Sequence, residues 1–348
     1  MSSGTVMSPN PLEQEPRHIA PFIAPADLTI IIVSFNDKHW LEPCLTSILE
    51  RAGDVSVDVV VVDNGTDGAH RFVESRFPHV RAIRTENRGF ANANNRGVMA
   101  GTGRYILFLN PDTQLLHGSL ADVVAALDER PEVGLVGVRQ VTADGTLWPT
   151  MRYFPGFTRA LGDAFALERW TARPRWAGER EINMALYDRE TECDWVSGSF
   201  MLARREAILS AGLFDERYFL YSEEPDLCLR MKRAGWSVRH LPTMTILHHS
   251  GKGGTRPKMI AQDAFTRRQY ARKYFSTSHR LAYLTAIGSG HAVRLALHGH
   301  RQELEGRAAA RLALRTLLGR EGAPFRQPPP TALSAPEPAL SDLERVSS

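Results

Sequence analysis

The feature that most constrains the fold of this chain is a repeated pattern of apolar runs, each ending in a polar turn. The runs are "LTIIIVSFN" (28–36), "VDVVVVDNGT" (57–66) and "YILFLNPD" (105–112). Continuous apolar runs bounded by turn residues predict strands that are buried on both faces. Helical spacing follows each run, so strands and helices alternate, which predicts βαβ units around a parallel sheet.

Further elements complete this pattern. Helices are predicted over 39–52, 67–77, 90–101, 118–130 and 223–235, and strands over 80–86 and 133–141. A strand or turn leading into a helix is predicted over 193–212, and one or two strands with a Gly-rich loop over 236–254. Residues 150–190, rich in Trp, Arg and Pro, predict irregular structure. The expected fold class is α/β, with a mainly parallel central sheet flanked by helices.

Composition narrows the class of protein. A chain of 348 residues with 43% hydrophobic content can bury a large core. Its net charge of +3 is only mildly basic, and we expect no nucleic-acid partner. Three widely spaced cysteines (Cys44, Cys193 and Cys228) form neither a metal-binding pattern nor a disulfide framework, which favours a reducing compartment. No signal peptide or apolar span of about 20 residues is evident, so we expect a cytoplasmic protein.

Polar residues gather where three predicted strands end: Ser34 to Asn36, Asp63 to Gly65, and Asn110 to Asp112. Open parallel sheets bind ligands beyond the carboxyl ends of their strands. A hard cation such as Mg²⁺ needs one or two carboxylates together with ligand phosphates, so Asp112 is a candidate ligand. Asn-Pro-Asp is also ordinary turn chemistry, and this pattern alone leaves both interpretations open. Basic residues that could meet phosphates are Arg88, Arg96, Lys252 and Arg256.

Two further clusters carry chemistry. "YSEEPDLCLR" places Glu223, Glu224 and Asp226 at a helix start, where acidic residues also favour the helix dipole and Ser222 could serve as N-cap. "LHHSGKGG" places His248 and His249 at a strand end. A histidine pair alone is weak evidence for a metal site.

Six stretches, taken in order, resemble the family 2 inverting glycosyltransferases of the GT-A fold, most closely the bacterial rhamnosyltransferase-like branch. They span about residues 28–255 and are "IIIVSFN", "VVVVDNGTDG", "ENRGFANANNRG", "FLNPDTQL", "WVSGSFMLARREAI" with "GLFDERYFLYSEEPDLCLRMKRAGW", and "ILHHSGKG". The resemblance implies a nucleotide-diphosphate sugar as donor, a divalent metal (Mg²⁺ or Mn²⁺) as cofactor, and a glycan or polyprenyl-linked acceptor. It favours dTDP-L-rhamnose as donor, with a UDP-sugar as the alternative.

The resemblance also implies roles for individual residues. Asp112 and His248 would hold the metal, and Glu224 would be the general base, where the family usually has Asp. The residues expected to bind the donor are Ser34, Asn36, Asp63, Asn87, Gly89, Asn95, Gly97 and Gly198. The residues expected near the diphosphate or the acceptor are Arg88, Glu223, Asp226 and Lys252.

Two other classes of protein compete with this expectation. A dinucleotide-dependent oxidoreductase needs a G-x-G-x-x-G turn after the first strand, and this chain has "SFNDKHW" there. A degenerate, non-catalytic sugar-nucleotide-binding protein would fit the Glu224 departure.

The expected domain organisation has four parts. Residues 1–27 form a disordered leader, and 28–275 form the GT-A domain, with a sugar-nucleotide half (28–140) and an acceptor half (141–275). Residues 276–321 form a basic amphipathic helical extension, and 322–348 a disordered Pro-rich tail. Within 279–320, helical spacing is expected to place leucine and alanine on one helix face, formed by Leu304, Ala308, Leu312 and Leu314 or Arg315. Arg307 and Arg311 are expected on another face. The extension either packs on the domain or contacts the inner face of the cytoplasmic membrane peripherally.

Overall fold

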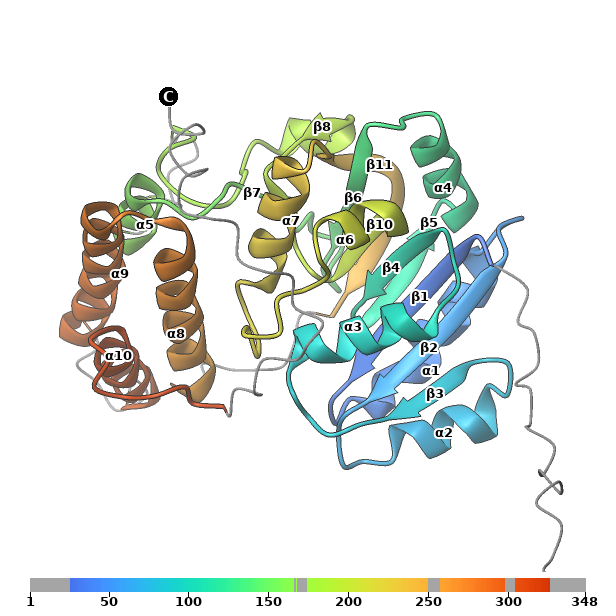
Figure 1. The fold of residues 1–348 in the computed structure, drawn as a ribbon, viewed down its shortest axis with the longest axis horizontal. Coiled ribbons are helices and arrows are strands. Elements are labelled where there is room, and N and C mark those ends of the chain that lie inside the picture. The colour runs from blue at the N-terminus through green and yellow to red at the C-terminus, as the bar shows by residue number, and fades with distance from the viewer. Residues whose placement is uncertain (1–25, 166, 168–173, 250–256, 298–303, 326–348) are drawn as a thin grey trace, which may run out of the picture.

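The structure is a computed structural model that describes residues 26–165, 167, 174–249, 257–297 and 304–325. Within these residues, a nine-stranded mixed sheet has the order β3-β2-β1-β4-β10-β6-β11-β5, with β8 beside β11 (Figure 1). Its strands are β1 (Leu28–Ser34), β2 (Val57–Asp63), β3 (Arg81–Arg84), β4 (Tyr105–Leu109), β5 (Thr113–His117), β6 (Val133–Val141), β8 (Thr191–Glu192), β10 (Phe200–Arg204) and β11 (Ser237–His248). A separate small sheet pairs β7 (Met151–Arg152) with β9 (Trp195–Val196).

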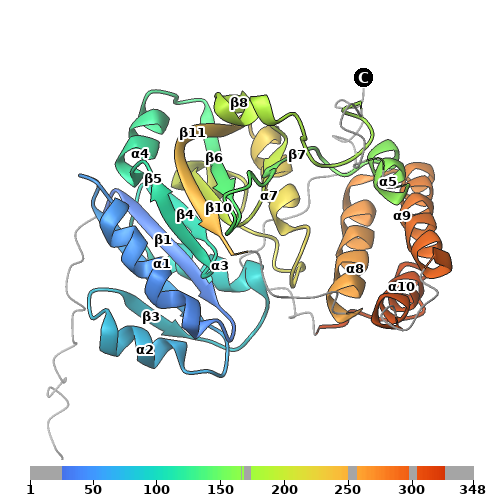
Figure 2. The ribbon, with the colours of Figure 1, turned by 180° about the vertical axis from the view of Figure 1, so that it is seen from behind.

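Helices cover both faces of the large sheet because successive strand residues point to opposite sides. In β1, Ile30 and Ile32 join one hydrophobic cluster, and Ile31 and Val33 join the other. The first cluster is covered by α1 (Lys38–Arg51), α2 (Ala69–Arg76) and α4 (Leu120–Asp128). The second is covered by α3 (Phe90–Ala100), α6 (Arg205–Ser210) and α7 (Glu223–Arg233), and Figures 1 and 2 show the two faces in turn.

The strands β3, β2, β1 and β4 are parallel, which confirms the predicted α/β class and mainly parallel sheet. Their register places Ser34 opposite Asp63, and Asp63 opposite Arg84. The polar strand ends therefore share one edge of the sheet, as expected for a ligand-binding edge. Strand β10 runs antiparallel between β4 and β6, so residues just before Phe200 arrive at this same edge.

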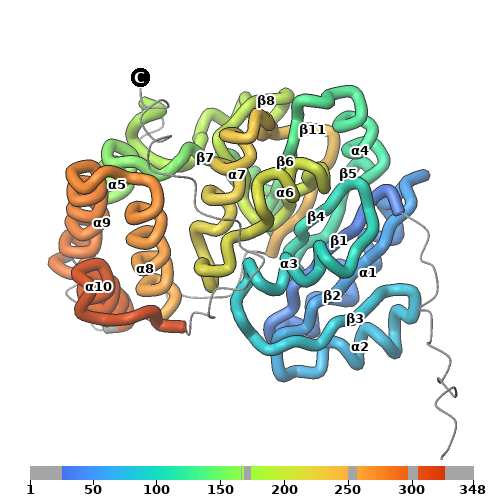
Figure 3. The backbone as a smooth tube through the Cα atoms, in the orientation of Figure 1, coloured from blue at the N-terminus to red at the C-terminus, as the bar shows by residue number. Residues whose placement is uncertain are grey.

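Four helices lie beyond the sheet and pack on one another (Figure 3). They are α5 (Phe157–Ala164), α8 (Pro257–Tyr274), α9 (Thr277–Leu297) and α10 (Leu304–Leu317). Ala264 of α8 packs with Ala313 and Leu317 of α10 in one apolar cluster. The packing therefore groups α8 with the helical unit, whereas the predicted division at 276 separates α8 from α9.

Several elements differ from the sequence prediction. The strand β5 and the helix α8 were not predicted, and the 150–190 segment contains β7, α5 and a 3-10 helix, η2 (Met184–Asp188). The buried face of α10 is formed by Ala309, Ala313 and Leu317. Ala308, expected on the apolar face, is exposed, and Leu312 is only half-buried. The side chain of Leu304 lies outside the described residues.

The chain ends contribute little to the described structure. Most of the predicted leader and tail, residues 1–25 and 326–348, lies outside the described residues. Phe325 is described, and its ring stacks on Phe219 with 5.4 Å between ring centroids. None of the helices in the described parts of the chain has the length and hydropathy that crossing a membrane requires.

Candidate functional site

The Asp63 carboxylate organises the turn that follows β2. Its Oδ1 accepts a hydrogen bond from the Gly65 amide at 2.9 Å, and its Oδ2 accepts one from the His70 amide at 3.0 Å. The His70 ring Nδ1 lies 2.6 Å from the same Oδ2. Burial acts to raise the pKa of Asp63, but the bonds from His70 and Gly65 outweigh it and the pKa is lowered. Because Asp63 is fully buried, direct contact with a nucleoside requires one of these partners to move.

The two other residues expected at the nucleoside end follow β1. Asn36 has a left-handed backbone (φ 61°), which asparagine tolerates, and its Oδ1 accepts a hydrogen bond from the Thr66 amide at 2.8 Å. Ser34 is fully buried, and its hydroxyl has no hydrogen-bond partner among the described residues. A buried hydroxyl without a partner is costly, so Ser34 offers an unused polar group at this edge.

Asp112 and His248 form the pair that best fits a divalent cation. The His248 Nε2 lies 3.1 Å from Asp112 Oδ1, and both side chains are partly exposed (15% and 14%). Burial acts to raise the pKa of Asp112, but the hydrogen bond and charge of His248 outweigh it, so the carboxylate stays ionised. In the part of the chain that the structure describes, no group of three or more His, Cys, Asp or Glu converges. Two protein ligands suit Mg²⁺ or Mn²⁺ when substrate phosphates complete the shell.

The second histidine of the pair takes a different position. His249 stacks on Trp40 with ring centroids 4.3 Å apart. Its Nε2 lies 3.1 Å from the Gln114 amide nitrogen. Of the two histidines, His248 is therefore the one whose ring nitrogen pairs with the Asp112 carboxylate.

Gln140 and Ser199 orient the His248 ring, and sequence analysis missed both. Gln140 is fully buried on β6, and its Nε2 lies 3.0 Å from His248 Nδ1. Its Oε1 accepts a hydrogen bond from the Ser199 hydroxyl at 2.5 Å. The signal available in the sequence was a lone amide in the apolar run 133–141. A metal-ligating histidine commonly has its other ring nitrogen fixed in this way.

Glu224 lies in the first turn of α7, with its carboxylate against Gly198. A Cβ at Gly198 would stand 2.6 Å from Glu224 Oε1, so a larger residue there would displace the carboxylate from this position. Burial raises the pKa of Glu224, while the charge of Arg152 and the Gly198 amide oppose this shift. A carboxyl with a raised pKa is suited to general-base chemistry.

The turn before Glu224 is strained. Tyr221 (φ 72°) and Ser222 (φ 69°) both adopt left-handed backbone conformations, which are unfavourable for these residue types. Ser222 occupies the N-cap position of α7, as the sequence allowed, but its side chain makes no capping hydrogen bond. Glu223 is buried, and its Oε2 has no partner among the described residues. Strain of this kind is commonly found at functional sites.

The N-x-G segment before α3 fits closely against the Phe219 backbone. Gly89 has a left-handed φ of 94°, and a Cβ there would stand 2.2 Å from the Phe219 carbonyl oxygen. The Asn87 side chain accepts a hydrogen bond from the Gly89 amide at 3.1 Å. This segment therefore adjoins the loop that leads to Glu224.

Other predicted site residues have packing roles. Asn95 donates to the Phe214 carbonyl (2.9 Å) and accepts from the Phe214 amide (3.0 Å), so it holds the loop after α6. Gly97 allows α3 to approach the side chain of Ile31. Asp226 is fully buried and is contacted by Lys273 (2.7 Å) and Tyr274 (2.6 Å) of α8, and by Arg230 within α7. These bonds join α7 to α8 and leave Asp226 unavailable to a diphosphate or an acceptor.

The basic residues are dispersed. Arg88 is half-exposed, with its Nε 3.5 Å from Glu86. Arg96 donates to Asn92 at 3.1 Å. Lys252 and Arg256 lie outside the described residues.

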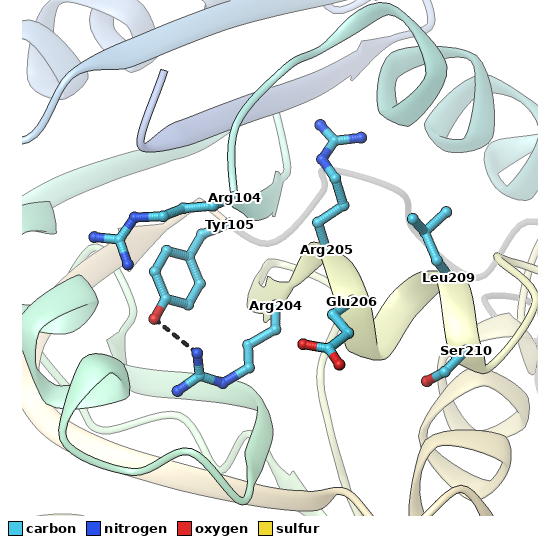
Figure 4. A pocket seen from close by; sticks show the side chains of 7 residues that line it. All are labelled: Arg104, Tyr105, Arg204, Arg205, Glu206, Leu209 and Ser210. Carbon is cyan, nitrogen blue, oxygen red and sulfur yellow. Dashed lines mark hydrogen bonds between the residues drawn. The ribbon is translucent and has the colours of Figure 1, made fainter. Parts of the chain in front are cut away.

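A pocket of about 610 Å³ lies at the other end of β4, where Tyr105 begins the strand (Figure 4). Its arginines are engaged within the protein: Arg104 pairs with Asp128, and Arg204 donates to the Val133 carbonyl. The pocket is lined by Arg104, Tyr105, Arg204, Arg205, Glu206, Leu209 and Ser210. It is therefore separate from the carboxyl-end edge and carries none of the predicted site residues.

A polar edge at the carboxyl ends of the parallel strands, an Asp–His pair and a half-buried carboxylate on a neighbouring helix are the features of a GT-A sugar-nucleotide transferase. The family model "Glycosyl transferase family 2" matches residues 29–207, just over half of the chain. The chain belongs to this family and is a glycosyltransferase. The oxidoreductase alternative is thereby excluded.

Two of the proteins to which this chain is similar in sequence are named rhamnosyltransferases. It is 33% identical over 235 residues to N-acetylglucosaminyl-diphospho-decaprenol L-rhamnosyltransferase of Mycobacterium tuberculosis, covering 64% of this chain and 76% of that protein. It is 26% identical over 235 residues to rhamnosyltransferase WbbL of Escherichia coli, covering 64% of this chain and 83% of that protein.

Solved structures show the same fold at low sequence identity. GalNAc-T7 with UDP, GalNAc and Mn²⁺ has a TM-score of 0.53 and 11% identity, and the match covers 85% of this chain and 56% of that chain. The mannosyltransferase PcManGT of Pyrobaculum calidifontis, with GDP-Man and Mn²⁺, has a TM-score of 0.50 and 17% identity, over 86% and 91% of the two chains.

Proposed function

We propose that this protein transfers L-rhamnose, with inversion, from dTDP-L-rhamnose to a hydroxyl of a lipid-linked or cell-surface glycan. The observation that carries the proposal is the position of Asp112, His248 and Gly198–Glu224 around one edge of the sheet. Both relatives described above are named as rhamnosyltransferases, which supports rhamnose as the sugar. The acceptor named for the Mycobacterium tuberculosis protein is a sugar diphosphate carried on decaprenol, which supports a polyprenyl-linked acceptor.

The reaction needs one proton acceptor from the protein. Glu224 takes the proton of the acceptor hydroxyl, and the oxygen attacks the anomeric carbon from the face opposite the nucleotide. This displacement inverts the anomeric centre and needs no covalent intermediate. Burial raises the pKa of the half-buried Glu224 carboxyl, and the charge of Arg152 and the Gly198 amide oppose this rise.

Asp112 and His248 are the proposed holders of a divalent metal, Mg²⁺ or Mn²⁺. Their oxygen and nitrogen donors fit such an ion, and both structural neighbours described above contain Mn²⁺ with a nucleotide or nucleotide sugar. When bound, the ion supplies positive charge to the departing diphosphate. Ser34, Asn36 and the Asn87–Gly89 turn are the proposed contacts to the donor from the protein itself.

Peripheral contact with the inner face of the cytoplasmic membrane is proposed for the helical unit. Arg311 and Arg315 are exposed on one side of α10, and the exposed Leu318 follows directly after the helix. Basic residues next to an exposed leucine suit a surface of anionic lipid, where a polyprenyl-linked acceptor is found.

The test is a donor screen followed by a transfer assay. Thermal shifts of the full chain are measured with dTDP-, UDP- and GDP-sugars in the presence of Mn²⁺, and dTDP-L-rhamnose is expected to stabilise it most. Transfer to a short polyprenyl-diphosphate sugar is then followed, with Glu224→Gln as the control. A larger shift with a UDP-sugar redirects the donor assignment. Stabilisation without transfer supports a non-catalytic sugar-nucleotide-binding protein.

A further inference from the structure

Lys273 of α8 joins two carboxylates of the GT-A domain. Its Nζ lies 2.7 Å from Asp215 Oδ2 and 2.7 Å from Asp226 Oδ1, and these two contacts are called the lysine bridge. Asp215 precedes the strained turn before Glu224, and Asp226 follows Glu224 in the first turn of α7. The lysine bridge therefore joins the two ends of the segment that carries Glu224, residues 215–226, which is called the base segment. In Figures 1 and 2, α8 is the helix of the helical unit nearest to α7.

The lysine bridge is shielded from water. The side chains of Lys273, Asp215 and Asp226 are 14%, 6% and 0% exposed. Burial acts to raise the pKa of Asp215, but the hydrogen bonds and charges of Arg217 and Lys273 outweigh it, and the pKa is lowered. Removing one partner of a buried ion pair is strongly destabilising, because the other charge is left uncompensated. Lys273 therefore holds both carboxylates in fixed positions.

Asp226 receives two further hydrogen bonds. The Tyr274 hydroxyl donates to Asp226 Oδ1 at 2.6 Å, and Arg230 Nε donates to Oδ2 at 2.8 Å. Both carboxylate oxygens are thus engaged, by donors from α8 and from α7 itself. Glu224 lies two residues before Asp226 in the same helical turn, where successive residues keep a fixed geometry. Fixing Asp226 therefore fixes the start of α7, from which the Glu224 side chain projects.

The middle of the base segment is held by α3. Glu216 is buried, and its two carboxylate oxygens accept hydrogen bonds from Asn92 at 2.7 Å and from Asn95 at 3.0 Å. A backbone in an unfavourable conformation persists only where the surrounding structure over-determines it. The strained turn before Glu224 therefore depends on contacts from both α3 and α8.

Attachment of the helical unit alone does not account for the lysine bridge. Another buried ion pair already joins α8 to the GT-A domain, because Arg267 donates to both carboxylate oxygens of Glu179, at 2.6 and 3.2 Å. These two bonds contact no residue of the base segment. The lysine bridge differs in that both of its carboxylates flank Glu224.

We propose that Lys273 is a positioning residue for the base Glu224 and that Tyr274 supports it. The inference rests on the proposed function and adds a role in catalysis for α8, which lies beyond the residues matched by the family model. The lysine bridge keeps the Glu224 carboxylate against Gly198, where it meets the acceptor hydroxyl. Without Lys273 the two bridged carboxylates face each other as like charges, so the ends of the base segment separate and Glu224 is displaced.

The experiment measures kcat and the donor KM at saturating acceptor, a short-chain polyprenyl-diphosphate sugar. Lys273→Met is expected to lower kcat by about 10- to 100-fold, the cost of a small misplacement of a reacting group. The donor KM should not change, because the strand ends that bind the donor are untouched. Lys273→Arg should keep most of the wild-type kcat, since its charged guanidinium has donors for both carboxylates. Tyr274→Phe should lose less than Lys273→Met and keeps the ring, so it tests the proposal even if Lys273→Met does not fold.

Lys232→Met is the matched control, since Lys232 lies in the last turn of α7, is 24% exposed and pairs with Glu192 at 3.2 Å. It should keep the wild-type kcat. Hydrogen exchange of the base segment gives a readout that needs no turnover, and exchange should be faster in Lys273→Met than in Lys232→Met.

The outcomes separate this inference from the proposed function. Wild-type kcat in both Lys273→Met and Tyr274→Phe overturns the inference alone. A loss of kcat in Lys232→Met equal to that in Lys273→Met, or a loss matched by a rise in the donor KM, also overturns it. Unchanged hydrogen exchange in Lys273→Met overturns the lysine bridge whether or not transfer is seen. Absence of transfer by the wild type overturns the proposed function.

Discussion

The Gln140 amide lies 3.0 Å from His248 Nδ1 and fixes the ring whose Nε2 faces Asp112. The Ser199 hydroxyl donates to Gln140 Oε1, so the amide nitrogen is directed at the imidazole. In this arrangement Nδ1 accepts, and the ring hydrogen on Nε2 points to Asp112. A cation bound at His248 Nε2 needs the tautomer that carries its proton on Nδ1. A half-turn of the Gln140 side-chain amide would direct Oε1 at Nδ1, where it would accept the hydrogen bond from that proton. Gln140 can therefore stabilise the ring both with and without a metal.

Replacing Gln140 by Met should weaken metal binding by about 10- to 100-fold, the usual cost of losing the partner of a ligating histidine. Mn²⁺ affinity is measured by electron paramagnetic resonance in the presence of dTDP. Gln114→Met is the control, because Gln114 contacts His249 instead. A larger loss in Gln114→Met than in Gln140→Met would move the metal site to the His249 side, and no loss in Gln140→Met would contradict the assigned role.

Glu224→Gln should lower kcat by about 10²-fold or more, because it removes the proton acceptor and keeps the shape. Gly198→Ala should also lower kcat, since the added methyl would lie 2.6 Å from Glu224 Oε1 and displace the carboxylate. Gly156→Ala is the matched control, because a Cβ there meets nothing within 4 Å.

Because burial raises the pKa of Glu224, wild-type kcat should increase with pH as the carboxyl ionises. A larger loss in Glu223→Gln than in Glu224→Gln would transfer the base role to Glu223.

Glu223 should make the folded state less stable as the pH increases. Burial and the neighbouring Glu224 raise its pKa well above the ordinary 4.5. The folded state therefore binds this proton more tightly than the unfolded state. The resulting stability is full below pH 4.5 and is lost as pH rises toward the raised pKa. Glu223→Gln should match the wild type near pH 4 and exceed its melting temperature at pH 7 to 8. Parallel melting curves across this range would contradict the raised pKa.

Ser222→Gly should stabilise the protein by about 1 kcal/mol, because glycine adopts the left-handed backbone without steric cost. The serine side chain makes no capping bond, so none is lost. Ser119 provides a control of opposite sign, since its side chain forms a complete capping box with Asp122. Ser119→Gly should lose a few tenths of a kcal/mol. Chemical denaturation of both variants measures the difference, and a loss in Ser222→Gly would show that the turn is not strained.

The residues whose positions could be predicted from sequence are those at the end of a strand or at the start of a helix. Asp112 and Glu224 follow a strand or begin a helix, where a one-dimensional pattern fixes their place. Arg152 was missed because it belongs to a strand of only two residues, which has no recognisable pattern in the sequence. Gln140 was missed because its role depends on His248, which lies 108 positions further along the chain. Asp226 was misjudged for the same reason, since Lys273 and Tyr274 come from α8, which had not been predicted.

The helix α8 escaped prediction because it packs on two sides. Its Ala264 faces α10, while Lys273 and Tyr274 face the acidic residues of the catalytic domain. When one of the two buried sides of a helix makes polar contacts, the sequence lacks the continuous apolar stripe by which an amphipathic helix is recognised. Removing residues after Phe275 would expose the α10-facing side of α8, so truncation is a poor test of membrane contact.

Point variants on α10 provide a sharper test of that contact. Arg311 and Arg315 are exposed, so Arg311→Gln with Arg315→Gln should preserve the fold and remove two positive charges beside Leu318. Each basic residue near an anionic surface contributes about 1 kcal/mol, and salt weakens this attraction. Co-sedimentation with phosphatidylglycerol vesicles at low salt should therefore decrease by about tenfold or more in the double variant. The control removes two exposed charges from α2, Arg71→Gln with Arg76→Gln, and should bind as the wild type does. If both double variants lose binding equally, the attraction is non-specific, and if the wild type does not bind, α10 serves only to pack against α8.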